Sequence, residues 1–243
     1  MKKHIPNMIT CCNLISGCIA VYWAFRENFD LALTFIVIGA VFDFFDGMTA
    51  RLLGVSSPIG KELDSLADDI TFGFAPSAIV FAFWNGLMEG QGAHCASPFA
   101  LPFLFTGGFA SVAFIMAAFS ALRLAKFNLD ERQTMGFIGL PTPANALFWG
   151  AIIVGSGDWL KSVPYASALI LLGVGLSCWL LVSEVPMFAL KFKHWGWRGN
   201  EVRYLFLFSC IPLLLFFGIT GIAIIIVWYV LLSFFTQRKP VSL

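Results

Sequence analysis

The sequence has few charged residues and none of the common metal or disulfide spacings. Asp, Glu, Lys and Arg make up 12% of the 243 residues. This is about half the share of a soluble globular domain, so the chain has too few charges to cover a water-exposed surface. The six cysteines include no C-x-x-C pair and the three histidines are scattered, which argues against a zinc site or a disulfide framework. The net charge of +1 offers no basic surface for nucleic acid.

Most of the chain consists of long apolar stretches. Hydrophobic residues reach 59% of the chain, and the mean hydropathy is +0.85. A membrane-spanning helix needs about 20 mostly apolar residues. The sequence predicts about eight such helices, at 8–25, 30–53, 62–85, 99–126, 143–157, 164–186, 203–217 and 219–236. We therefore expect an all-α polytopic membrane protein, folded as a single integral membrane domain over residues 1–243.

The basic residues test this topology independently. Cytoplasmic loops carry an excess of Lys and Arg, and eight spans would place 13 of the 15 basic residues on the side that holds both termini. Only Arg26 and Lys161 fall on the other side. The sequence therefore predicts a protein of the cell (inner) membrane with both termini in the cytoplasm.

Acidic residues gather in one window of the chain, although the membrane makes them costly. Six of the 14 acids lie between positions 43 and 69, at the cytoplasmic end of the second span and the start of the third. A charged residue at the centre of a span costs about 2.5–3.5 kcal/mol on insertion scales. Such a concentration therefore indicates a function rather than chance.

The spacing of these acids predicts two stripes that can face each other. At about 100° per residue, Asp43 and Asp46 share one face of a helix, and Asp64 and Asp68 share a face of the next. Joined antiparallel near residues 54–59, the two helices would bring four carboxylates together. Such a set repels itself unless cations are bound. Hard oxygen donors suit two ions of Mg²⁺ or Mn²⁺, an arrangement used for displacement at phosphorus.

Small residues and one arginine accompany the carboxylates. Gly47, Ala50 and Gly60 lack the bulk that would keep a ligand from the backbone. Arg51 can hold a phosphate with its planar fork of donors. Taken one at a time, such residues are also typical of a proton or ion pathway, or of close helix packing. Asp69, directly after the last of the four acids, is expected to be a solvated neighbour.

The complete array over residues 43–68, D-x2-D-G-x2-A-R-x8-G-x3-D-x3-D, resembles the signature of the CDP-alcohol phosphotransferases. Members of that family are integral membrane enzymes that transfer a phosphatidyl or similar group from a CDP-linked donor to an alcohol and release CMP. The resemblance implies the CDP-alcohol phosphotransferase fold, a homodimer, and an active site at the cytoplasmic face. Spans one to four, about residues 8–126, would carry that site.

Three further stretches resemble the phosphatidylserine synthase members of this family. They are residues 68–76, which end in G-F-A-P, residues 121–128 (A-L-R-L-A-K-F-N) and residues 137–144 (F-I-G-L-P-T-P-A). In the second stretch Lys126 stands where the subfamily has Arg, which keeps the charge but loses the bidentate fork. The resemblance implies transfer of the phosphatidyl group from CDP-diacylglycerol to the hydroxyl of L-serine. Both substrates and the membrane lipids are the expected partners.

Roles for individual residues follow from the spacing and the resemblance together. The expected metal ligands for two divalent cations, Mg²⁺ or Mn²⁺, are Asp43, Asp46, Asp64 and Asp68. Asp68 is also the candidate general base for the serine hydroxyl. The expected CDP-diacylglycerol contacts are Pro6, Asn7, Thr10, Gly47, Ala50, Arg51, Ser57 and Gly60. The candidates for binding the serine carboxylate, at the cytoplasmic end of span four, are Arg123, Lys126 and Asn128.

Three alternatives remain open on the sequence alone. A family relative without catalytic activity is one of them, and the intact signature disfavours it. Another acceptor, glycerol 3-phosphate or an inositol phosphate, would use the same chemistry but would need additional basic residues near the site. A cation- or proton-coupled transporter would need acidic or polar residues near mid-membrane in several spans. Spans six to eight contain almost none, which argues against the transporter.

Overall fold

Helices form nearly all of the chain that the structure describes. The computed structural model describes residues 4–55, 57–90, 109–129, 137–188, 196–197 and 200–236. The α-helices are α1 (His4–Phe25), α2 (Phe29–Leu53), α3 (Pro58–Asp68), α4 (Ala75–Gly90), α6 (Ile115–Leu129), α7 (Thr142–Ser162), α8 (Ala166–Val182), α9 (Glu201–Phe217) and α10 (Ile219–Thr236). A π-helical turn, η1 (Asp69–Phe74), joins α3 to α4, and a 3-10 turn, η2 (Phe109–Phe114), precedes α6.

The predicted spans correspond to helical segments with shifted ends. α3, η1 and α4 run on as one rod, which is the third span, and α7 extends beyond the predicted 143–157. Of the fourth span the structure describes η2 and α6, and residues 99–108 lie outside the described residues. Among the described residues, five helical segments are long and apolar enough to cross a membrane, and α8 is a shorter apolar helix. The expected all-α polytopic membrane architecture is confirmed.

Local signals set the ends of the helices that carry the acidic window. The Asn28 side chain accepts a hydrogen bond from the Leu31 backbone N–H and so caps the start of α2. Gly54 ends α2 in the left-handed region, at φ 62°, where a residue without a side chain is favoured. Ser57 caps α3, and Pro58 occupies its first turn, where a missing N–H costs nothing.

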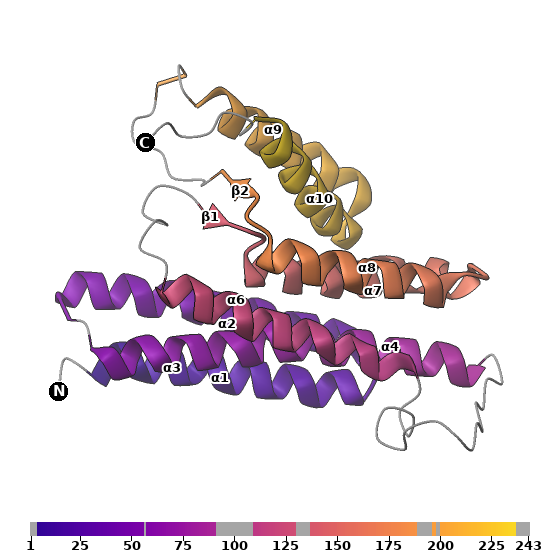
Figure 1. Ribbon diagram of the computed structural model, residues 1–243, viewed down its shortest axis with the longest axis horizontal. Coiled ribbons are helices and arrows are strands. Elements are labelled where there is room, and N and C mark those ends of the chain that lie inside the picture. The colour runs from indigo at the N-terminus through magenta and orange to yellow at the C-terminus, as the bar shows by residue number, and fades with distance from the viewer. Residues whose placement is uncertain are drawn as a thin grey trace.

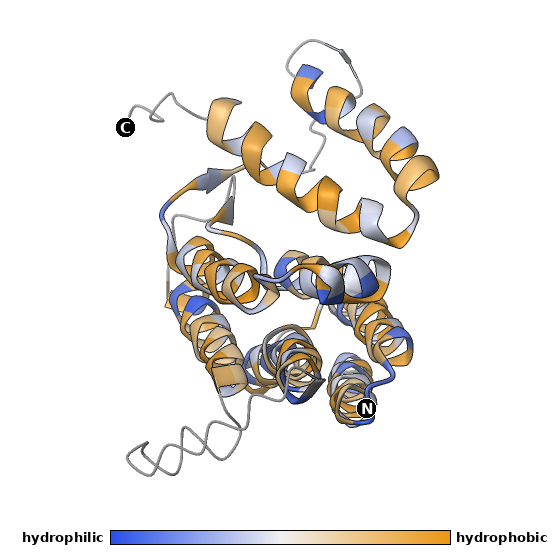
Figure 2. Cartoon of the chain, turned by 90° about the vertical axis from the view of Figure 1, so that its right-hand side faces the viewer, coloured by the Kyte–Doolittle hydropathy of each residue, from blue (hydrophilic) through white to orange (hydrophobic). Residues whose placement is uncertain are grey.

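The helices lie side by side in a bundle, with one hairpin set apart (Figure 1). α1 packs against α2, α3, η1 and α4, whereas α2 and α3 make few close contacts with each other. The hairpin of α9 and α10 turns at Gly218 and reaches the bundle chiefly through α10 against α7. Hydrophobic residues make up much of this hairpin (Figure 2), and Leu215 and Phe216 are largely exposed, as suits contact with lipid.

A short strand pair next to the start of α7 and the end of α8 was not expected from the sequence. β1 (Phe137–Ile138) pairs antiparallel with β2 (Pro186–Met187). Gly139 follows β1 at φ 75°, and a Cβ atom there would lie 2.8 Å from the Leu181 carbonyl oxygen. The G-L-P stretch therefore needs glycine at this position to pass close to the end of α8.

Candidate active site

Three of the four predicted metal ligands lie together between α2 and α3. Asp43 comes from α2, Asp64 and Asp68 come from α3, and one oxygen of each lies within 4.8 Å of the others. All three side chains are half-buried. Oδ1 of Asp64 is buried and has no hydrogen-bond partner among the described residues. Three oxygen donors at this spacing, one of them unpaired, fit a hard divalent cation.

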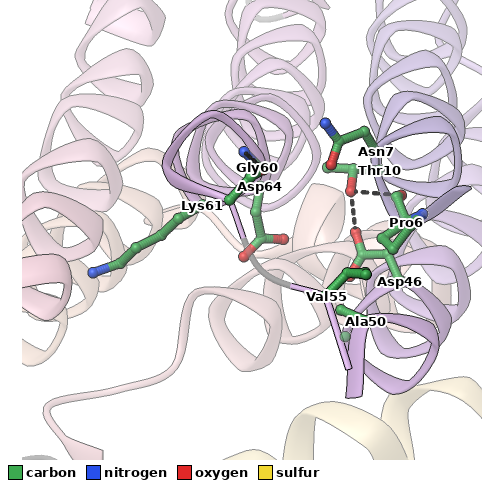
Figure 3. Close-up of a pocket in the computed structure, with 11 residues that line it drawn as sticks. Pro6, Asn7, Thr10, Asp46, Ala50, Val55, Gly60, Lys61 and Asp64 are labelled. Carbon is green, nitrogen blue, oxygen red and sulfur yellow. Dashed lines mark hydrogen bonds between the residues drawn. The ribbon is translucent and has the colours of Figure 1, made fainter. Parts of the chain in front are cut away.

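Asp46, the fourth predicted ligand, lies beside this group and is held by α1. It is buried, and its Oδ2 lies 2.5 Å from the Thr10 hydroxyl, which is also 3.1 Å from the Pro6 carbonyl oxygen (Figure 3). Asp46 therefore joins the carboxylate cluster to the wall of the neighbouring cavity, which α1 helps to form.

A cavity of about 340 Å³ opens next to the carboxylates, between α1, α2 and α3 (Figure 3). Seven of the eight residues predicted to contact the donor line it: Pro6, Asn7, Thr10, Gly47, Ala50, Ser57 and Gly60. Arg51, the eighth, is exposed, and its Nη1 lies 3.7 Å from the point where a Cβ of Gly47 would stand. Its guanidinium therefore lies near the cavity without lining it.

Small residues keep this cavity open. A Cβ atom on Gly60 would lie 3.0 Å from Oδ1 of Asn7 and 3.0 Å from Oγ of Ser57, so even one methyl group would press on the wall. Ser57 has a structural task as well, because its Oγ accepts a 3.0 Å hydrogen bond from the Gly60 N–H at the start of α3. The serine is therefore both a helix cap and part of the cavity lining.

Asn13 and Thr71 support Asp68 from α1 and η1, which the sequence did not lead us to expect. Nδ2 of Asn13 donates a 3.1 Å hydrogen bond to Oδ1 of Asp68. The Thr71 hydroxyl donates a 3.0 Å hydrogen bond to the Asn13 carbonyl oxygen. A Cβ on Gly39 would lie 2.9 Å from Oδ1 of Asn13, so glycine allows this close approach. Asn13 stands in the opening stretch of α1, but 55 residues separate it from Asp68, and no local pattern relates the two.

Lys61 is a further cavity-lining residue that the sequence reasoning missed. It follows Gly60 directly within the signature, and this adjacency was the available signal. Its Nζ donates a 3.0 Å hydrogen bond to the Asn128 backbone carbonyl, so the side chain extends from the cavity wall to α6. Val55, in the turn between α2 and α3, also lines the cavity and carried no signal.

The three candidates for the serine carboxylate point to different neighbours. Arg123 is buried, and its Nη1 donates a 3.3 Å hydrogen bond to the Thr142 hydroxyl of α7. Asn128 turns to α3, where its Nδ2 donates a 2.7 Å hydrogen bond to Oγ of Ser65. Lys126 is exposed and makes no hydrogen bond within the described part of the chain. The structure therefore does not gather these three side chains into one pocket.

Asp69 differs from the expectation of a solvated neighbour. It is the first residue of the π-helical turn, and its Oδ1 is buried without a hydrogen-bond partner among the described residues. π-helical turns inside α-helices are frequent at functional sites. Here the turn places Asp69 against α6, whereas Asp68 faces α1 through Asn13.

The chain is similar in sequence to known proteins over most of its length. The family model for CDP-alcohol phosphatidyltransferase matches residues 3–179. A CDP-diacylglycerol–serine O-phosphatidyltransferase of Bacillus subtilis is 36% identical over 82% of this chain and 95% of its own length. Enzymes of the same name from Methanocaldococcus jannaschii and Helicobacter pylori are 32% and 34% identical. These matches cover 74% and 58% of this chain, and 72% and 54% of the respective relative.

Proposed function

Because the chain belongs to the CDP-alcohol phosphatidyltransferase family, we propose that it transfers the phosphatidyl group of CDP-diacylglycerol to the hydroxyl of L-serine. The products are phosphatidylserine, CMP and a proton. The observation that carries the proposal is the convergence of Asp43, Asp64 and Asp68 beside a cavity that the signature residues line. The three relatives named above, all serine O-phosphatidyltransferases, support serine as the acceptor.

The carboxylate cluster is the proposed site for two divalent cations, Mg²⁺ or Mn²⁺. The proposed ligands are Asp43, Asp46, Asp64 and Asp68; the unpaired Oδ1 of Asp64 supports this set most directly. When bound, such cations neutralise charge on the phosphoryl oxygens and stabilise the departing CMP. Thr10 would hold Asp46 in place through its hydroxyl contact with Oδ2.

The cavity between α1, α2 and α3 is the proposed pocket for the CDP part of the donor. Its proposed contacts are Pro6, Asn7, Thr10, Gly47, Ala50, Arg51, Ser57 and Gly60. Gly47, Ala50 and Gly60 give the donor access to the backbone, and the exposed Arg51 can fold over a phosphate at the rim. The acyl chains would then lie toward the lipid.

Asp68 is the proposed general base. It would take the proton of the serine hydroxyl as that oxygen attacks the phosphorus of the phosphatidyl group, the bond to CMP breaks and CMP leaves with the electron pair. The hydrogen bond from Asn13 to Oδ1 would fix the carboxylate and leave Oδ2 for the incoming hydroxyl. Asp68→Asn should therefore abolish CMP release while binding of CDP-diacylglycerol, measured by a thermal shift of the detergent-solubilised protein, persists. Normal turnover by this variant would refute the role.

The proposed setting is one integral membrane domain that works as a homodimer in the cell (inner) membrane. Five long apolar helical segments support the membrane location. The excess of Lys and Arg on one side supports a cytoplasmic position for both termini and for the active site.

Release of CMP with a panel of acceptors tests the proposed function. The purified protein would receive CDP-diacylglycerol, Mg²⁺ or Mn²⁺, and L-serine, glycerol 3-phosphate or an inositol phosphate in turn. We expect release that depends on L-serine. Release with glycerol 3-phosphate alone, or at the same rate without any acceptor, would refute serine as the acceptor, and no release with any acceptor would favour the transporter.

A further inference from the structure

Buried polar atoms without partners gather where η1, α6 and α7 meet. Within the described residues, Oδ1 of Asp69, Oγ of Ser120, Nε of Arg123 and both amide atoms of Asn145 are buried and make no hydrogen bond. Ser120 and Asn145 are fully buried, and Arg123 is 8% exposed. Native proteins leave few buried polar atoms unpaired, so a group of them indicates a bound molecule that completes the set. We call these four residues the polar cluster.

Short distances join Asp69 to Ser120, and a hydrogen bond links Arg123 to α7, the helix that also carries Asn145. A Cβ atom on Gly73 would lie 2.6 Å from Oδ1 of Asp69 and 2.9 Å from Cβ of Ser120, so these two side chains meet over Gly73. Arg123 follows Ser120 by about one turn of α6, on the same face. Its hydrogen bond to Thr142 then reaches the first turn of α7.

The polar cluster also lies next to the carboxylates of the active site. The Arg123 guanidinium interacts electrostatically with the Asp68 carboxylate and with Tyr229 of α10. Asn145 is about one turn beyond Thr142, the hydrogen-bond partner of Arg123. η1 packs against both α6 and α7, whereas the donor cavity is lined from α1, α2, α3 and the turn before α3. The polar cluster therefore lies near Asp68, but its residues belong to elements that do not line the donor cavity.

We propose that the polar cluster binds the amino-acid end of the acceptor L-serine, with Arg123 on its carboxylate and Asp69 on its ammonium group. This inference rests on the proposed function. Serine is a zwitterion, and a guanidinium and a carboxylate on one face of a site match its two charges. The amide of Asn145 and the hydroxyl of Ser120 supply uncharged donors and acceptors for the remaining polar atoms.

This arrangement also explains how one acceptor is chosen over another. The serine hydroxyl would extend toward Asp68, because Asp68 lies within electrostatic range of Arg123 and next to Asp69 in the chain. A phosphorylated acceptor such as glycerol 3-phosphate would bring its negative charge against Asp69, and like charges disfavour binding. Lys126 and Asn128 are outside the polar cluster and take no part in the proposal.

Two truncated acceptors separate the two charge contacts. Ethanolamine lacks the serine carboxylate, and 3-hydroxypropanoate lacks the ammonium group. CMP release from CDP-diacylglycerol would be measured with all three acceptors for the wild type, Arg123→Met, Asp69→Asn and the control Lys161→Met, which removes an exposed charge at the far end of α7. An analogue that is not turned over would be measured as a competitor of serine. The ratio of kcat/KM values, or of binding constants, within one preparation does not depend on the fraction of folded protein.

The proposal predicts a different defect for each variant. Arg123→Met should lower the preference for serine over ethanolamine by about 10- to 100-fold, and Asp69→Asn should lower the preference for serine over 3-hydroxypropanoate by a similar factor. These are the factors expected for a lost hydrogen bond to a charged group. Lys161→Met should leave both ratios unchanged.

Two results would overturn the proposal in distinguishable ways. A wild-type enzyme that uses serine, with preference ratios in Arg123→Met and Asp69→Asn that stay within twofold of the wild type, would place serine elsewhere and leave buried water as the partner of the cluster. A wild-type enzyme that does not use serine would refute the proposed function itself, and the serine site with it.

Discussion

The hydrogen bond between Asn13 and Asp68 gives the most specific prediction about turnover. Asn13→Leu keeps the number and branching of the side-chain heavy atoms on α1 and removes the 3.1 Å hydrogen bond to Oδ1 of Asp68. A hydrogen bond to a charged group contributes about 1.5–3 kcal/mol, and each 1.36 kcal/mol in the barrier is a factor of ten in rate. If Asp68 is the base, kcat should fall by about 10- to 150-fold.

The assay follows steady-state CMP release while the donor and serine concentrations are varied separately. Asn13 does not line the donor cavity, so the KM for CDP-diacylglycerol should stay within about twofold of the wild type. Asn7→Ala is the matched control, because Asn7 lies on the same helix but lines the cavity, and it should raise the donor KM. An unchanged kcat in Asn13→Leu, or a higher donor KM as its main defect, would refute the positioning of Asp68 by Asn13.

Two further predictions concern glycines. Gly60→Ala should raise the KM for CDP-diacylglycerol several-fold in the CMP-release assay. The reason is that the new methyl group would lie 3.0 Å from both Asn7 Oδ1 and Ser57 Oγ. An unchanged KM would show that the donor binds elsewhere. Gly139→Ala should destabilise the fold by about 1–2 kcal/mol, because φ at this position is 75° and the new Cβ would lie 2.8 Å from the Leu181 carbonyl oxygen. The loss should be measurable as a lower Tm in detergent. Gly175→Ala, with no atom within 4 Å, should leave Tm nearly unchanged.

The parts of the fold that the sequence predicted are those with a strong local signal. Apolar length located the helices, and a four-residue period brought Asp64 and Asp68 to one face of α3. The signature residues Gly47 and Gly60 line one cavity because α2 and α3 both pack on α1. The strand pair β1 and β2 escaped prediction, since two-residue strands carry no periodicity.

The missed parts of the site depend on contacts between distant segments. The hydrogen bond from Asn13 to Asp68 joins residues that are 55 positions apart. Asp69 begins a π-helical turn, and no residue spacing in the sequence predicts that turn. From the sequence, the burial of Arg123 against α7 could not be distinguished from the snorkelling that is common for an arginine near the end of a span. Sequence reasoning thus predicted the residues that line the cavity between α1, α2 and α3 better than it predicted the surroundings of Arg123.

Dependence of turnover on divalent cations tests the central claim most directly. CMP release from CDP-diacylglycerol and L-serine would be measured after chelation, and then as Mg²⁺ or Mn²⁺ is titrated back, for the wild type and for Asp64→Asn. Asp64 is the variant of choice because its unpaired, buried Oδ1 belongs to the carboxylate cluster. We predict that chelation abolishes release, that either cation restores it in the wild type, and that Asp64→Asn needs far more cation or stays inactive. Serine-dependent release that survives both chelation and Asp64→Asn would contradict a metal-assisted transfer at these carboxylates.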